Sequence, residues 1–179
     1  MKIYTRNGDE GETGLLYGDK VSKASSLPEA YGTVDEAQAI LGLVRTECKK
    51  ESDLEEKIIH IERDLYVLMA ELATDPSKHD KLESGKNKVN EEMVEFLEKF
   101  IDDLSSRFEL PKEFVIPGQN RISALLDIAR TVVRRAERRT IACEFKKSLA
   151  VPYLNRLSDL LWAMARWQEG ESITSRSVK

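Results

Sequence analysis

Apolar residues recur at intervals of three and four along most of this chain, and that spacing constrains the fold more than any other feature of the sequence. Residues three and four apart lie on one face of an α-helix, whereas a half-buried strand alternates apolar and polar residues. The clearest run lies at 51–73, with apolar positions at Ile58, Ile61, Leu65, Leu68, Met69 and Leu72. We therefore expect an amphipathic helix there, with one face buried against the rest of the protein.

Four more segments show the same spacing, and each follows a residue or turn that often precedes a helix. The expected helices are 29–48 after Pro28, 91–108 after Asn90, 120–145 after the Pro117-Gly118 turn, and 153–169 after Pro152. Asparagine caps the free N–H groups at the start of a helix, and proline is tolerated in a helix only near that start. Five helices with little strand pattern predict an all-α fold, a five-helix up-and-down bundle.

The 179 residues suit one domain, so we expect a single domain over 1–179. Three segments lie outside the expected helices. We expect a glycine-rich arm over 1–25, a mobile connection with little to bury over 74–90, and a frayed tail over 170–179.

Charge and composition exclude several kinds of function. A formal net charge of −4 argues against general binding to nucleic acid or to anionic membranes. No stretch approaches the roughly 20 apolar residues of a membrane helix, and the first residues lead into a polar segment and not into a secretory signal. The chain has two scattered cysteines and two scattered histidines, which make no metal-ligand set. We expect a cytoplasmic protein without a metal site of its own.

The arm contains Gly8, Gly11 and Gly14 at three-residue intervals. Glycines allow a backbone to turn its amide N–H groups toward an anion, and nearby hydroxyl and ammonium groups add further donors. The GxxxxGK[ST] pattern of a P-loop is absent, and no βαβ unit surrounds the glycines. The arm is therefore either a phosphate-binding loop or an ordinary glycine-rich segment.

Residues 129–139 contain five arginines and one acid. At about 100° per residue, one stripe of this helix contains Arg130, Arg134, Glu137 and Arg138. Like charges so close together repel unless an anion lies between them, and a polyphosphate would supply that charge. The alternative is a solvated basic face with salt bridges to Asp or Glu. Asp35, inside the 29–48 helix, is either a partner of one arginine or a solvent-facing acid.

Five segments, in order along the chain, resemble the PduO-type ATP:cob(I)alamin adenosyltransferases. They are 4–15 (YTRNGDEGETGL), 29–36 (EAYGTVDE), 114–118 (FVIPG), 129–139 (ARTVVRRAERR) and 153–161 (YLNRLSDLL). The resemblance covers nearly the whole chain. It implies a homotrimer of five-helix bundles that binds ATP and cobalamin between neighbouring subunits. It also implies that Co(I) attacks C5′ of ATP, which yields adenosylcobalamin and triphosphate.

The same resemblance implies roles for individual residues. It implies a nucleotide loop of Thr5, Arg6, Asn7, Gly8, Thr13, Gly14 and Lys23. It implies that the helices contribute Arg134, Arg135, Glu137, Arg138 and Asn155 to the same nucleotide. The residues implied to act on the reaction itself are Arg130, Arg134, Asp35 and Phe114.

Two of these roles are specific. Arg130 and Asp35 resemble a salt-bridged pair across the subunit boundary. Phe114 resembles the aromatic residue that packs under the corrin, where it keeps water or dimethylbenzimidazole away from cobalt and so eases reduction of Co(II) to Co(I).

The resemblance also implies partners. We expect Mg²⁺ to accompany ATP, held mainly by phosphate oxygens and water. We also expect a reductase that donates the electron. The alternative function is a non-catalytic helical module that binds a nucleotide or RNA through the arginine-rich helix.

Overall fold

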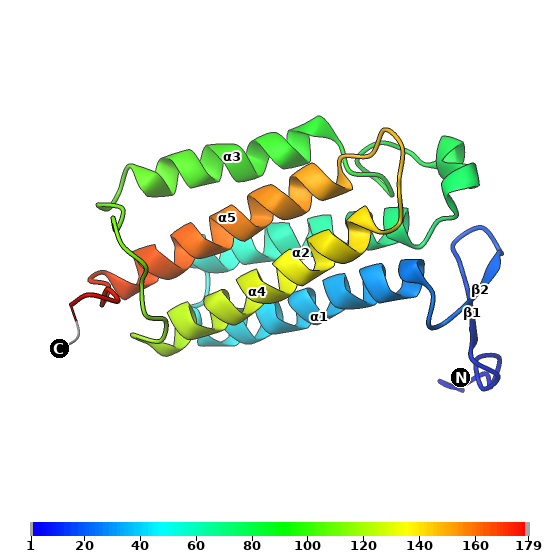
Figure 1. Ribbon diagram of the computed structural model, residues 1–179, viewed down its shortest axis with the longest axis horizontal. Helices are drawn as coiled ribbons and strands as arrows, with labels where there is room; N and C mark the ends of the chain where they lie inside the picture. The colour runs from blue at the N-terminus through cyan, green and yellow to red at the C-terminus, as the bar shows by residue number, and fades with distance from the viewer. Residues whose placement is uncertain (1, 178–179) are drawn as a thin grey trace.

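The computed structural model describes residues 2–177, and five α-helices in it form an up-and-down bundle (Figure 1). The helices are α1 (Ser26–Glu47), α2 (Asp53–Leu72), α3 (Glu91–Ser105), α4 (Arg121–Ile141) and α5 (Ala150–Glu169). Each helix runs antiparallel to the one before it. One end of the bundle therefore carries the arm with the α2–α3 and α4–α5 connections, and we call it the arm end. The opposite end, which we call the loop end, carries the α3–α4 loop and the C-terminal segment (Figure 1). The expected all-α fold is confirmed.

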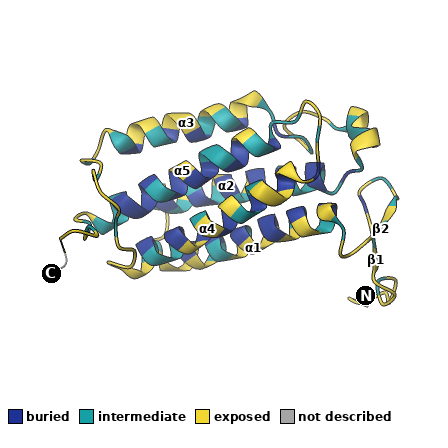
Figure 2. Cartoon of the chain, in the orientation of Figure 1, coloured by how far each residue is buried: buried dark blue, intermediate teal, exposed yellow. Residues whose placement is uncertain are grey.

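The bundle is held together by one apolar core. α4 lies between α1 and α5 and makes its most extensive contacts with those two helices. The inward faces of the helices are buried and the outward faces exposed (Figure 2). The fully buried side chains include Leu41, Ile61, Leu65, Leu97, Leu126, Tyr153 and Leu154. Burial of a large apolar side chain contributes roughly 1.5–3 kcal/mol to the stability of the folded state. The three- and four-residue spacing places these side chains on one face of each helix, so the helices pack with those faces together.

Polar caps fix where three helices begin. The side chains of Ser52, Asn90 and Asn120 accept hydrogen bonds from backbone N–H groups at the starts of α2, α3 and α4. At α4 the cap is reciprocal, because Ser123 Oγ also accepts from the backbone N–H of Asn120. The prediction of Asn90 as a helix cap is therefore confirmed.

The predicted boundaries differ from the observed ones mainly at two prolines and at two helix ends. α1 begins at Ser26 and α5 at Ala150, so Pro28 and Pro152 both lie inside a first turn. The first N–H groups of a helix have no intrahelical partner, and a proline there loses no hydrogen bond. α3 ends at Ser105 and α4 at Ile141, each a few residues before the predicted end.

Most of the connection at 74–90 is exposed or partly exposed, which agrees with the expectation of little to bury, and its expected mobility stays a prediction. It contains the 3₁₀ helix η1 (Pro76–Lys81), and both Thr74 and Val89 are buried. The Glu71 carboxylate on α2 accepts a hydrogen bond from Val89 N at 2.7 Å. A buried carboxylate thus holds the returning chain, a contact that local sequence patterns do not reveal.

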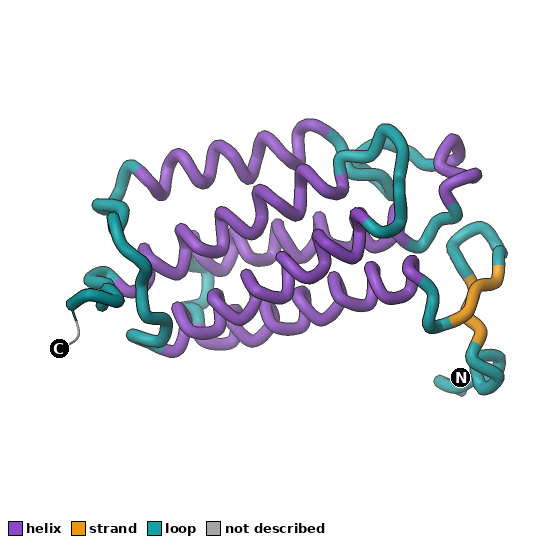
Figure 3. Tube along the Cα trace, in the orientation of Figure 1, coloured by secondary structure: helices purple, strands orange, loops and turns teal. Residues whose placement is uncertain are grey.

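The arm has more structure than a plain glycine-rich segment. Its strands β1 (Glu12–Gly14) and β2 (Lys20–Ser22) pair as an antiparallel ribbon, the one two-stranded element among the described residues (Figure 3). Leu15 inserts into the core, and Leu16 N donates to Ala73 O at 2.9 Å. These contacts fix the ribbon to the arm end of the bundle.

The segment expected to be a frayed tail pairs with the α3–α4 loop as far as Arg176. Val178 and Lys179, the last residues of that expected tail, lie outside the described residues, as does Met1 of the arm. Within residues 2–177, no helix has both the length and the hydropathy needed to cross a bilayer.

Candidate functional site

The five arginines of residues 129–139, all on α4, do not share one environment. Arg135 and Arg139 reach across to α1, where Arg135 pairs with Glu36 and Arg139 Nε lies 3.2 Å from Glu29 Oε1. These ion pairs are about half exposed and link two antiparallel helices. The salt bridges of the alternative are present for this pair of arginines, and the nucleotide role of Arg135 stays a prediction.

Arg134 and Arg138 are different, because no carboxylate of residues 2–177 forms an ion pair with either. Both side chains are exposed, and Arg138 Nη1 donates to the carbonyl oxygen of Arg134 at 2.9 Å. One helical turn separates the two guanidiniums, so they repel each other in the absence of an anion. This part of α4 has the charge and the donors of an anion site.

Glu137 and Asn155, both predicted to serve the nucleotide, lie side by side between α4 and α5. Asn155 Nδ2 donates to Glu137 Oε1 at 3.2 Å, and Asn155 Oδ1 accepts from Arg156 Nη1 at 2.8 Å. The structure thus brings together Arg134, Glu137, Arg138 and Asn155 along one edge of α4. Asn155 lies well inside α5 and does not cap it.

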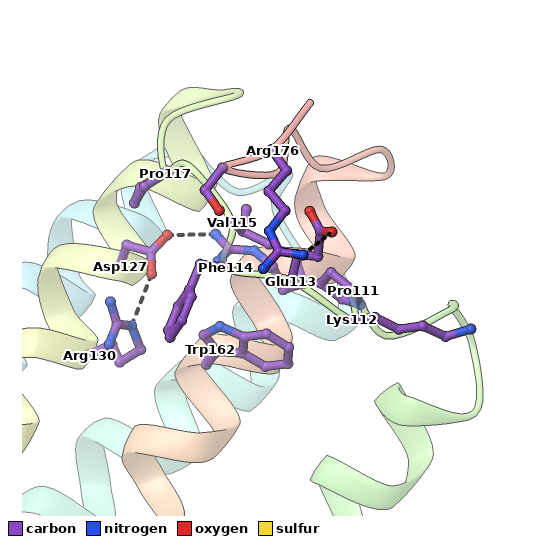
Figure 4. Close-up of a pocket in the computed structure, with 12 residues that line it drawn as sticks. Pro111, Lys112, Glu113, Phe114, Val115, Pro117, Asp127, Arg130, Trp162 and Arg176 are labelled. Carbon is purple, nitrogen blue, oxygen red and sulfur yellow. Dashed lines mark hydrogen bonds and ion pairs between the residues drawn. The ribbon is translucent and has the colours of Figure 1, made fainter. Parts of the chain in front are cut away.

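Arg130, one turn before Arg134, is held by a carboxylate. Arg130 Nε donates to Asp127 Oδ1 at 2.9 Å, and Asp127 Oδ2 accepts from Arg166 Nη2 at 2.6 Å (Figure 4). Arg166 also donates to Glu169 Oε1 at 2.9 Å, and its side chain is only 2 % exposed. Asp127 therefore joins a buried arginine of α5 to a partly exposed arginine of α4.

A cavity of about 570 Å³ opens beside Arg130 at the loop end (Figure 4). Phe114 and Trp162 give it an aromatic surface, and Arg130 supplies a guanidinium. Phe114 is 88 % exposed, which is unusual for a large apolar ring. Trp162 is only partly buried and lines this cavity. The cavity suits a large ligand with an apolar face.

The predicted arm residues form one compact group at the arm end. Lys23 Nζ donates to Gly8 O at 2.8 Å, and a Cβ at position 8 would lie 2.7 Å from that nitrogen. Thr13 and Gly14 lie on β1, and Asn7 N donates to Thr5 Oγ1 at 3.4 Å. Arg6 has a positive φ of 63° and is exposed. The arm therefore presents a tight loop with exposed donors, in which Gly8 leaves space for Lys23.

A single chain does not bring all the predicted residues together. The arm lies at the arm end, whereas the α3–α4 loop that carries Phe114 lies at the loop end (Figure 1). Arg130 lies near the middle of α4 and lines the Phe114 cavity. Asp35 is exposed on α1 and forms no ion pair within residues 2–177, and Arg130 pairs with Asp127 instead. The expected pair of Arg130 with Asp35 across a subunit boundary stays a prediction.

Several residues that matter to the site were not singled out from the sequence. They are Glu29, Glu36, Asp127 and Glu169. A weak signal existed for one of them, because Asp127 precedes Arg130 by three residues and side chains at that spacing face each other. In the described part of the chain, no group of three His, Cys, Asp or Glu side chains converges as metal ligands.

The fold and the site define a helical bundle that offers an anion site on one helix and an aromatic cavity beside it. The sequence profile of the cobalamin adenosyltransferase family matches residues 3–168. The corrinoid adenosyltransferase of Citrobacter freundii is 42 % identical over 171 residues, which cover 94 % of this chain and 95 % of that protein. That of Bacillus subtilis is 38 % identical over 93 % of this chain and 86 % of its own length. The chain belongs to the cobalamin adenosyltransferase family.

Solved structures agree with this assignment. A PduO-type ATP:corrinoid adenosyltransferase from Lactobacillus reuteri, in a variant with histidine in place of a phenylalanine and complexed with cobalamin and ATP, superposes with a TM-score of 0.88. It is 28 % identical, and the match covers 99 % of this chain and 98 % of that one. A variant of the same enzyme with lysine in place of an arginine, complexed with ATP, gives a TM-score of 0.85. The resemblance stated from the sequence motifs is confirmed, and the enzyme interpretation is favoured over a non-catalytic binding module.

Proposed function

We propose that this protein transfers the 5′-deoxyadenosyl group of ATP to a reduced corrinoid in a site that neighbouring subunits share. The observation that carries the proposal is the pair Arg134 and Arg138, which have no carboxylate partner within residues 2–177 on a helix whose other four arginines each have one. A nucleotide triphosphate supplies the missing negative charge. The donors of the arm bind the same polyphosphate from a neighbouring copy.

The reaction balances without a further reactant once the corrinoid is reduced. The electron pair on Co(I) forms a bond to C5′ of ATP, the C5′–O bond breaks, and triphosphate leaves with the electrons of that bond. Negative charge increases on the leaving oxygen. Guanidiniums fixed beside that oxygen stabilise the transition state, since such preorganised groups contribute most where charge develops.

The aromatic cavity receives the corrinoid. Phe114 lies against the lower face of the ring and excludes an axial ligand from cobalt, while Trp162 extends the apolar surface. Arg130 lines the same cavity, held in place by Asp127. These residues bind and orient one substrate, whereas Arg134, Arg138 and the arm bind the other.

A complete site requires more than one copy, because the arm and the α3–α4 loop that lines the Phe114 cavity lie at opposite ends of the bundle (Figure 1). Leu43 on α1 and Ile128 on α4 are each about half exposed. Both lie between the ion pairs Arg121–Glu47 and Arg135–Glu36 that link these helices. An apolar patch among charges on this face supports contact between copies, and the family resemblance implies three of them.

Mg²⁺ enters with ATP in this proposal. The described residues offer no set of protein ligands for it, so phosphate oxygens and water hold it, with Glu137 as the acid within the arginine-rich stretch. The electron-donating reductase and the cytoplasmic location also stay predictions from the sequence.

An anaerobic assay tests the proposal. The protein is mixed with chemically reduced cobalamin, ATP and Mg²⁺, and the cobalamin absorbance and the released triphosphate are followed. We expect a light-sensitive Co–C species and triphosphate in equal amounts. Retention of ATP without either product would support the non-catalytic alternative. Sedimentation equilibrium tests the trimer separately.

A further inference from the structure

The loop that carries Phe114 has few anchors of its own. It connects the end of α3 to the start of α4 and contains no helix or strand. Between residues 109 and 119, the main chain makes two hydrogen bonds to other parts of the described chain. Ile116 N donates to Ile173 O at 2.8 Å, and Phe114 O accepts from Ser175 N at 2.8 Å. Both partners belong to the segment that follows α5.

This segment, residues 173–176, pairs with the loop through one isolated antiparallel bridge, and we call it the tail strand. Val115 and Thr174 form the central bridge, and Arg176 Nη1 lies 3.8 Å from Glu113 Oε1. Ser175 and Arg176 also line the cavity that contains Phe114 (Figure 4). The tail strand therefore both holds the loop and forms part of the cavity wall.

The ring of Phe114 contributes little to its own placement. With 88 % of the residue exposed, few contacts hold the side chain where it stands. Its position over the cavity then depends on the main chain of residues 113–116. That main chain is held by the tail strand, since no other backbone hydrogen bond in residues 2–177 reaches it.

We propose that the tail strand is a positioning element for the corrinoid, because it sets the place of Phe114 beneath the ring. This inference rests on the proposed function of Phe114. Ser175 is its central residue, since the N–H of Ser175 donates directly to the carbonyl of Phe114. Ser175 touches neither substrate through this bond and acts through Phe114.

One substitution isolates this hydrogen bond. Ser177 N donates to Thr174 O at 3.1 Å, so Ser175 is the second residue of a four-residue turn, a position that favours proline. Ser175→Pro removes the N–H donor and keeps the turn. Ser175→Ala keeps the N–H and removes only the hydroxyl, so the difference between the two variants measures the main-chain bond. A chain that ends at Ser172 removes the whole tail strand.

The experiment compares these three variants with the parent protein and with full-length Phe114→Ala. All of them are measured with ATP bound. The readouts are the electronic spectrum of bound Co(II) cobalamin, kcat and KM for each substrate, and hydrogen exchange of the Ile116 amide. We expect Ser175→Pro to shift the Co(II) spectrum toward that of Phe114→Ala. Its kcat/KM for cobalamin falls about threefold to tenfold below that of Ser175→Ala, as loss of one hydrogen bond allows. The KM for ATP stays the same, and the Ile116 amide exchanges faster. The shortened chain shows a larger loss.

Two results would overturn the inference, and they separate it from the function it rests on. A changed Co(II) spectrum in Phe114→Ala, with parent spectra in both Ser175→Pro and the shortened chain, removes the positioning role and leaves the proposed function standing. A parent spectrum in Phe114→Ala removes the assigned place of Phe114 and the inference with it. A general loss of folding would instead raise the KM for both substrates and lower the melting temperature. The kinetic measurements and a thermal unfolding curve detect these two changes.

Discussion

Two neighbouring parts of α4 use the same residue type for different purposes. Arg130 donates to Asp127, whose carboxylate is 6 % exposed and also binds Arg166 of α5. Arg134, one turn further on, is exposed and has no carboxylate partner in residues 2–177. Arg130, Arg134 and Arg138 follow one another at the same four-residue spacing. The position of the acids, and not the pattern of the arginines, therefore decides which guanidinium is held by a carboxylate and which is not.

The largest effect is expected where an arginine is buried. Arg166→Met leaves Asp127 and Glu169 without their buried partner, and breaking such a pair costs about 3–5 kcal/mol of unfolding free energy. Urea unfolding measures this loss. Arg135→Met, which breaks the half-exposed pair with Glu36, is the matched control, and we expect it to cost about 1 kcal/mol or less. Equal losses in the two variants would contradict the distinction.

The next effect is on the reaction. Arg134→Ala removes a guanidinium that has no structural partner, so we expect kcat/KM for ATP to fall about 100-fold while the unfolding free energy changes by about 0.5 kcal/mol or less. Anaerobic kinetics and urea unfolding measure the two quantities. The control is Arg121→Ala, at the far start of α4, where the exposed arginine pairs with Glu47. Normal turnover in Arg134→Ala would count heavily against the proposed site.

A smaller effect is expected where the arginines pair across helices. Glu29→Gln leaves Arg139 without its partner, and an exposed pair of this kind contributes roughly 0.2–1 kcal/mol. Salt screens such charges, so the difference from the parent protein should shrink at high ionic strength. A double-mutant cycle with Arg139→Met measures the pair itself. A coupling that salt does not reduce would show that the pair is more enclosed than the structure indicates.

The smallest effect concerns a buried aspartate without an arginine. Asp64 accepts from Tyr153 Oη at 3.3 Å and lies 3.7 Å from His60 Nε2. Burial raises its pKa, although the charge of His60 and the hydrogen bond from Tyr153 oppose that shift. A carboxyl whose pKa is raised by folding stabilises the folded state most when protonated. Its contribution therefore falls as the pH rises from the unfolded value of about 3.9 toward the folded one.

Asp64→Asn removes this pH dependence. We expect the variant to gain stability relative to the parent protein between acid and neutral pH, as measured by urea unfolding at several pH values. Asp102→Asn, at an exposed position on α3, serves as the control and should leave the profile unchanged. A parent-like profile in Asp64→Asn would show that burial does not govern this carboxyl.

Much of the fold could be predicted because its causes are local. The apolar spacing of α2 and the cap at Asn90 depend on residues within a few turns of each other. The burial of Val89 could not be predicted, since it depends on Glu71 of a different element. The strands of the arm are three residues each, too short to show alternation.

The site was predictable to a lesser extent. Helical spacing placed Arg134 and Arg138 together, and among residues 2–177 no carboxylate forms an ion pair with either. The sequence alone did not show that Arg135 and Arg139 meet acids of α1, because those acids lie far away along the chain. The role of Phe114 came from the family resemblance. Its pairing with Ser175 was visible only once the chain was folded.

The separation of the arm from the Phe114 cavity has a genetic consequence. In a ring of subunits, each centre would combine the arm of one polypeptide with the cavity of the next. Two alleles, one damaged in the arm and one in the cavity, would then complement each other when expressed together, because some mixed rings contain a centre with both parts intact. Two alleles damaged in the same part would not.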